Sequence, residues 1–371
     1  MSKVFNYSLI ISKLSDMSFT CNLCGIFYIL FLLDSTSCFS QSSGLFTNDS
    51  MLEFVLKGDV YGLMNDRGEQ PQYHTFQLVY NDFNGTSVEI PVQIKVRGHF
   101  RKLKQNCKYP PLLLNFSTET STHSIFSQQD KLKLVTPCRD EKYVLREYLV
   151  YKMYNLTTPK SFNVRLVKFD LESNRPKTKD AEPLYGILLE EEDQMAKRNN
   201  SVSVEGKVVR PQQTQIDDFL NMSVFEYMIG NTDWSVQYLQ NVKLIASDSI
   251  SVPSTVPYDF DHAGIVGAPY ALPAPELMMS STRERRYRGY CIKDMSQFDD
   301  VLSEYNQLKG DLYKVFSENP LIDQNTIKTT IRFLDEFYKT INDPKKVKNE
   351  FQYPCRADGT GNVVIQGLKK N

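Results

Sequence analysis

The stretch GNTDWSVQYLQNVKLIA (residues 230–246), followed by VPYDFD (residues 256–261), decides the interpretation of this 371-residue chain. Gly230 is predicted to end a helix, and Asp233 lies in the loop after it. Asn241 follows eight positions later, directly before a β-branched strand, and Asp259 ends the next strand. The pattern predicts a β-hairpin flanked by an acid, an asparagine and a further acidic pair.

This order of side chains is the one that phosphoryl transfer requires. One carboxylate orients the attacking hydroxyl, while an asparagine and a second carboxylate hold divalent metal on the phosphates. We therefore predict that Asp233 is catalytic and that Asn241, Asp259 and Asp261 bind metal. A site in which the protein supplies only a few oxygen ligands favours Mg²⁺, because this ion keeps several bound waters. Taken singly, Asp233 and Asn241 could equally be turn residues.

A lysine that contacts the nucleotide is predicted on the strand KLKLV. Lys133 alternates with apolar residues there, and Glu147 follows fourteen positions later in the next helical segment, where it could orient the lysine. We assign both residues to catalysis and Lys133 also to cofactor binding. Lys108 is its competitor for ATP, and Glu190 is predicted to hydrogen-bond the nucleotide. The alternative is that Lys133 and Lys108 are ordinary solvent-exposed lysines and that Glu190 belongs to a solvent-exposed acidic run.

The chain changes character near its middle. Residues 41–192 read as strands with one principal helix at 143–155, whereas residues 193–371 read mainly as helices. The predicted fold class is α+β, with a two-lobed kinase-like fold: a strand-rich N-terminal lobe, and a helical C-terminal lobe that carries a short β-hairpin at the site.

The chain resembles the spore-coat protein H (CotH) kinase family, an atypical kinase-like group of exported bacterial proteins. The resemblance covers residues 96–264 and rests on these segments: VRGHFR (96–101), KLKLVT (131–136), LREYLVYKMYNL (145–156), YGILLEEEDQMAKR (185–198), GNTDWS (230–235), NVKLI (241–245) and VPYDFDHAG (256–264). It implies that Asp233 is the catalytic-loop carboxylate, that Asn241 binds metal and that Asp259 or Asp261 is the metal-binding acid. It also implies Mg²⁺ and ATP as cofactors.

The N-terminus is typical of a targeting segment. Residues 17–33 carry no charge, Lys3 and Lys13 precede them, and small residues follow. This predicts a signal peptide over residues 1–40, with cleavage between Ser40 and Gln41 and a secreted, periplasmic or cell-envelope location. The alternative is an uncleaved anchor. Contact with a membrane is expected only through this segment.

Four cysteines remain after residue 40. An oxidising compartment would allow two disulfides, and of the three possible connectivities we predict Cys107 with Cys138 and Cys291 with Cys355.

Composition narrows the possible partners. Lys and Arg number 43 against 44 Asp and Glu, so the charge balance disfavours nucleic acid as a partner. The expected function is phosphate transfer from Mg-ATP to a protein or surface acceptor. The alternative is a non-catalytic envelope or surface binding protein. A haloacid-dehalogenase-type phosphatase is disfavoured because its acidic pair belongs at the first strand of a parallel sheet.

Overall fold

The structure is a computed structural model that describes residues 44–175, 182–206 and 208–352. The predicted signal peptide and Cys355 lie outside these residues, so export and the second disulfide stay predictions. Within the described ranges, no helix is long and apolar enough to cross a membrane.

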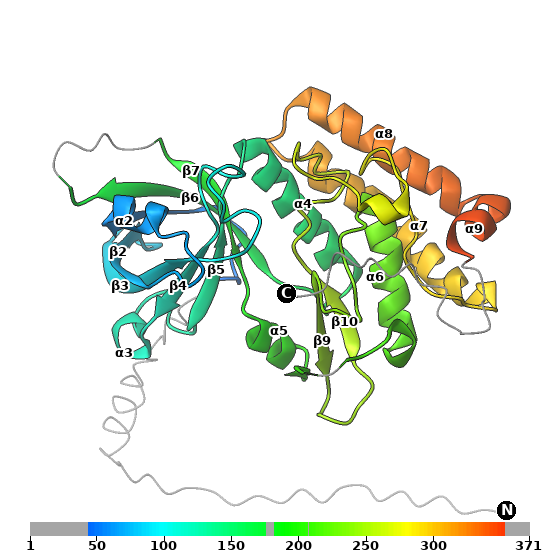
Figure 1. The fold of residues 1–371 in the computed structure, drawn as a ribbon, viewed down its shortest axis with the longest axis horizontal. Coiled ribbons are helices and arrows are strands. Elements are labelled where there is room, and N and C mark those ends of the chain that lie inside the picture. Colours follow the sequence, from blue (N-terminus) through cyan, green and yellow to red (C-terminus); the bar gives the residue numbers. More distant parts are fainter. Residues whose placement is uncertain (1–43, 176–181, 207, 353–371) are drawn as a thin grey trace, which may run out of the picture. The chain divides into compact units, whose positions relative to one another are not determined.

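Seven strands of the first half close into a β-barrel (Figure 1). Their order around the barrel is β1, β2, β3, β4, β5, β7, β6. β1 pairs in parallel with β6, and every other neighbouring pair is antiparallel. The strand bounds are Leu52–Gly58 (β1), His74–Asn81 (β2), Ser87–Val96 (β3), Leu112–Phe116 (β4), Lys131–Val135 (β5), Val164–Ser173 (β6) and Leu184–Leu189 (β7).

The predicted two-lobed kinase-like fold is wrong, because the strand-rich part is a closed mixed barrel and not an open lobe. Across the parallel ladder of β1 and β6, Leu52 pairs with Val167 and Gly58 pairs with Ser173. This ladder leaves neither β1 nor β6 as an edge strand, and closure of the sheet removes the unpaired backbone groups that an edge would expose.

Apolar side chains fill the barrel interior. Leu56, Leu78, Ile94, Leu114 and Leu188 come from five different strands, and each is fully buried. Burying one such side chain contributes roughly 1.5–3 kcal/mol to stability. The interior is therefore packed core, and a ligand site must lie outside it.

Helices pack beside the barrel, and α4 makes the connection, with β6 and β7 on one side and α6 and α7 on the other. The principal helix predicted at residues 143–155 is confirmed, and so is the largely helical character of the chain after residue 192. The helix bounds are Val60–Asn65 (α2), Thr118–Ser121 (α3), Glu141–Thr157 (α4), Glu192–Arg198 (α5), Ile216–Ile229 (α6), Asp299–Ser317 (α7), Gln324–Ile341 (α8) and Pro344–Phe351 (α9), with 3-10 turns at Pro211–Gln213, Pro275–Leu277 and Met295–Phe298.

The predicted β-hairpin is also confirmed, and a short strand extends it to three strands. β9 (Val242–Ala246) lies between β8 (Val202–Ser203) and β10 (Ser254–Pro257), and both pairs are antiparallel. Val242 pairs with Pro257, and the amide of Tyr258 donates to the carbonyl of Asn241 over 3.0 Å. Asn241 and the DFD segment thus leave the hairpin at the same end.

The disulfide predicted between Cys107 and Cys138 is confirmed, and it closes a loop of 31 residues. Chain entropy gives a cross-link of this length a contribution of about 3–4 kcal/mol. The double variant Cys107→Ser, Cys138→Ser should therefore lose roughly that much free energy of unfolding in urea titrations. Reduced parent protein should lose at least as much, because reduction also opens the predicted Cys291–Cys355 bridge, and an unchanged urea midpoint in the variant would contradict the prediction.

Candidate functional site

A pocket of about 410 Å³ lies where the ends of β3, β4 and β5 meet the hairpin and the DFD segment. Five of the predicted site residues line it: Lys133, Asp233, Asn241, Asp259 and Asp261. The pocket is lined as well by Arg97, His99, Phe100, Arg101, Tyr151, Gln240, Tyr258 and His262.

The loop that carries Asp233 is held in place from its backbone. α6 ends at Gly230, whose φ of 69° is left-handed, and a Cβ there would come within 2.9 Å of the Thr282 carbonyl. The amide of Asp233 then donates to Asn231 Oδ1 over 3.0 Å. Arg288 donates to the carbonyls of Thr232 and Trp234. Both neighbours of Asp233 are therefore clamped.

The Asp233 carboxylate accepts hydrogen bonds from two neighbouring amides. Gln240 Nε2 donates to Oδ1, and Asn241 Nδ2 donates to Oδ2 over 3.1 Å. His262 Nδ1 lies 3.9 Å from Oδ2. Burial, with a further contribution from Asp259, raises the pKa of Asp233 above its ordinary value. A carboxylate with a raised pKa is better matched to proton acceptance near neutral pH.

The backbone of Asn241 is strained, and its side-chain nitrogen already donates hydrogen bonds. Its φ of 52° is left-handed, a conformation that Asn tolerates better than most residues. Its Nδ2 donates both to the carboxylate and to the backbone carbonyl of Asp233. The amide oxygen Oδ1 accepts no hydrogen bond from any described residue, so it is available to a ligand.

The two acids of the DFD segment differ in their surroundings. Asp259 also has a left-handed φ, of 63°, and its amide donates to the Tyr151 hydroxyl over 2.8 Å. Its carboxylate has no hydrogen-bond or ion-pair partner among the described residues. Asp261, by contrast, is buried and accepts from the Tyr270 hydroxyl over 3.1 Å. Burial and the nearby Asp259 raise the pKa of Asp261 to about 6.

Arg101 connects Asp261 to the barrel side of the pocket. Its Nη1 lies 3.6 Å from Asp261 Oδ2 and 3.8 Å from Glu147 Oε2. Both carboxylates are almost completely buried, and burial and Asp261 hold the pKa of Glu147 well above its ordinary value. The ion pair predicted between Lys133 and Glu147 is not formed, because Glu147 pairs with Arg101.

Lys133 faces the pocket without an acidic partner among the described residues. Its Nζ lies 5.0 Å from the centre of the Tyr258 ring. Burial, and then repulsion from Arg97 and Lys243, lower its pKa to about 8. Arg97 also lines the pocket and forms no ion pair with a described residue. Two cations that repel one another across a pocket favour an anionic ligand between them.

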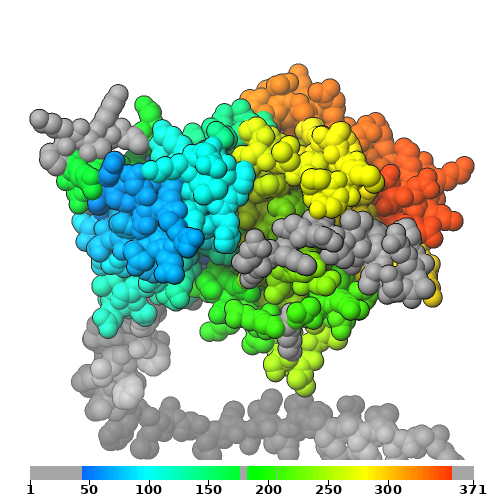
Figure 2. Space-filling view, viewed as in Figure 1, coloured from blue at the N-terminus to red at the C-terminus, as the bar shows by residue number. Residues whose placement is uncertain are grey.

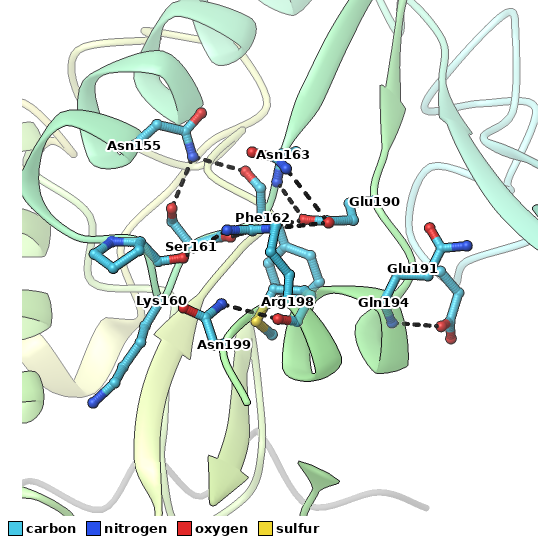
Figure 3. A network of polar contacts seen from close by, with 12 residues as sticks. Asn155, Lys160, Ser161, Phe162, Asn163, Glu190, Glu191, Gln194, Arg198 and Asn199 are labelled. Carbon is cyan, nitrogen blue, oxygen red and sulfur yellow. Dashed lines mark hydrogen bonds and ion pairs between the residues drawn. The ribbon is translucent and has the colours of Figure 1, made fainter. Parts of the chain in front are cut away.

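Two predicted nucleotide contacts lie away from the pocket. Lys108 is exposed, and its Nζ lies over the Tyr109 ring. Glu190 belongs to the network in Figure 3, where Arg198 binds both of its oxygens at 3.1 and 2.9 Å, and the amide of Asn163 donates to it over 2.8 Å. The structure thus uses Glu190 to join β7, the start of β6 and α5.

The donor set of the pocket fits Mg²⁺. The free Oδ1 of Asn241 and the carboxylate of Asp259 are hard oxygen donors, whereas the oxygens of Asp261 face Arg101 and Tyr270. No three His, Cys, Asp or Glu side chains among the described residues are grouped closely enough to enclose an ion. Waters and phosphate oxygens would complete the coordination, as Mg²⁺ commonly requires.

No family model and no curated protein matches this sequence. The resemblance to the CotH kinase family therefore stays a prediction.

Proposed function

We propose that this protein transfers the terminal phosphoryl group of Mg-ATP to a hydroxyl group of a protein or surface acceptor. One observation supports this most directly: two cations without acidic partners, Lys133 and Arg97, line the same pocket as the free oxygens of Asn241 and Asp259. A site that presents cations and hard oxygen donors together suits an anion bound with a divalent metal.

Each side chain has a separate role in this proposal. Lys133 and Arg97 bind phosphate oxygens, and Asn241 and Asp259 would hold Mg²⁺. The metal supplies charge neutralisation on the phosphates when it is bound. Asp233 orients the acceptor hydroxyl and takes its proton. The hydroxyl oxygen bonds to the terminal phosphorus as the bond from that phosphorus to the bridging oxygen breaks, and ADP leaves with the bond electrons.

Nucleotide binding is tested by thermal shift with Mg²⁺ and ATP. Ligand at a hundred times its dissociation constant should add about 2.7 kcal/mol of stability. ATP binding without any transfer would favour the non-catalytic binding protein, and no binding would reject the proposal.

The pH dependence of ATP affinity gives a sharper prediction for Lys133. Its pKa of about 8 means that Lys133 in the free protein loses its charge as the pH rises past 8. Bound phosphate favours the charged form, so the dissociation constant for ATP should increase between pH 7 and 9.5, and Lys133→Met should weaken binding and remove much of this dependence.

Lys131→Met is the matched control for this measurement, because Lys131 is an exposed lysine two positions earlier on β5. It should keep the affinity and the pH profile of the parent in isothermal titration. Equal profiles for Lys133→Met and the parent would contradict the role of Lys133.

A further inference from the structure

A basic surface continues directly from the mouth of the pocket. We define the basic loop as residues 97–108, RGHFRKLKQNCK, which contain Arg97, Arg101, Lys102, Lys104 and Lys108 and no Asp or Glu. The whole chain has a formal net charge of −1, so this concentration of positive charge is local. In Figure 2 the cyan atoms from this part of the chain adjoin the yellow atoms of residues near 270.

The lysines of the basic loop are bonded to neutral groups. Lys102 Nζ donates to the carbonyl of Gly68 over 2.7 Å, Lys104 donates to Asn65 Oδ1, and Lys108 lies over an aromatic ring. Among the described residues none of the three forms an ion pair. The charge of Lys102 also acts on Asp66, whose carboxylate lies 3.1 Å from the His74 ring nitrogen Nε2. Their positive charge thus remains available to a partner.

The basic loop is also held rigid. The disulfide ties Cys107 to Cys138. Arg67 donates to the carbonyls of Lys102, Cys107 and Lys108. Arg139, itself exposed and cationic, donates to the carbonyl of Gln105 over 3.0 Å. A surface fixed in this way loses little conformational entropy when it binds.

Phe100 places the basic loop beside the proposed phosphoryl acceptor site. The residue is 44% exposed, and its ring centre lies 5.7 Å from that of Tyr270 and 6.3 Å from that of His262. His262 in turn lies 3.9 Å from Asp233. The ring of Phe100 thus links the Asp233 side of the pocket, through His262, to the basic loop, whose lysines begin two positions later in the chain.

We infer that the basic loop binds an acidic peptide segment of the acceptor protein, with carboxylates on Lys102, Lys104 and Lys108 and an apolar side chain on Phe100. This inference rests on the proposed function, because it gives that site its acceptor class. Lysines in the same loop as an exposed aromatic side chain complement a segment that alternates acidic and hydroxyl residues around an apolar one.

Fluorescence anisotropy with a labelled 15-residue peptide of alternating Asp and Ser that carries one Leu tests the inference without nucleotide, so the result does not depend on ATP binding. The parent should bind this peptide and not the Lys-Ser counterpart. The triple variant Lys102→Ala, Lys104→Ala, Lys108→Ala should weaken binding roughly tenfold or more, and added salt should weaken it further in the parent.

The matched control is Lys345→Ala, Lys346→Ala, Lys348→Ala, which removes three exposed lysines from α9. It should stay within about twofold of the parent. Three results would overturn the inference: no binding of the acidic peptide by the parent, equal loss in both triple variants, or tighter binding of a single-stranded oligonucleotide of equal charge or of vesicles with 30% phosphatidylserine. Failure of ATP binding alone would reject the proposed function and leave the peptide measurement intact.

Discussion

The Asp233→Asn variant is expected to bind Mg-ATP as the parent does and to transfer phosphate about two to four orders of magnitude more slowly. Asn has nearly the shape of Asp, and the backbone clamps from Arg288 and Asn231 do not depend on the charge. What the substitution removes is the carboxylate, whose raised pKa suits it to accept the proton of the hydroxyl, and with it one of the two oxygens that accept from Gln240 and Asn241.

The contrasting variant is Asp259→Asn. Its carboxylate has no protein partner among the described residues, and its charge raises the pKa of Asp233 and Asp261. Neutralising it should leave the fold intact or slightly more stable without metal, while Mg-ATP binding is lost. Calorimetry of the parent and both variants separates the roles: identical heats from all three would favour the non-catalytic binding protein.

Local sequence patterns predicted the individual elements of the fold well. The period of the segment near residue 148 predicted α4, Gly230 predicted the end of α6, and the β-branched runs predicted the hairpin. These features depend on neighbours within about ten residues. The closure of the barrel depends on β1 pairing with β6 more than a hundred residues later, and no local periodicity specifies such a pairing.

The candidate site, like the fold, was predictable where it depends on neighbouring residues and not where it depends on distant contacts. Asp233, Asn241 and Asp259 meet in one pocket because the short hairpin fixes their separation, and that hairpin was visible in the sequence. The ion-pair partner of Glu147 could not be predicted from the sequence. The sequence rule pairs a strand lysine with the helix glutamate, but here the basic loop places Arg101 over Glu147, and the run VRGHFR was the only local signal for it.

Arg101→Leu is expected to reduce the free energy of unfolding by about 3–5 kcal/mol at pH 7.5, because it leaves two buried carboxylates without their cation. Arg101 lies within 4 Å of both Glu147 and Asp261, and its own side chain is only 11% exposed. Exposed ion pairs contribute far less, so Arg139→Leu, at an exposed arginine, is the control and should change stability by under about 1 kcal/mol.

The pH dependence of this loss distinguishes unpaired charge from lost packing. The guanidinium of Arg101 lowers the pKa of both buried acids, against burial, which raises them. Without it both pKa values rise further above the unfolded values of about 4. At pH values between the pKa values of the unfolded state and those of the folded state, the folded protein holds protons that the unfolded protein has released. The free energy of unfolding therefore falls as the pH rises through this range. The deficit of Arg101→Leu should therefore be largest at neutral pH and should shrink towards pH 4.

A second substitution completes the test of Arg101. Glu147→Gln removes one of the two unpaired charges, so Arg101→Leu with Glu147→Gln should recover part of the stability at pH 7.5 and flatten its pH dependence, when urea titrations are run without Mg²⁺. A deficit that is the same at pH 4.5 and pH 7.5, and that Glu147→Gln does not relieve, would assign the loss to packing of the arginine stem. In that case the charge of Arg101 would not be what holds Asp261 and Glu147 in the folded site.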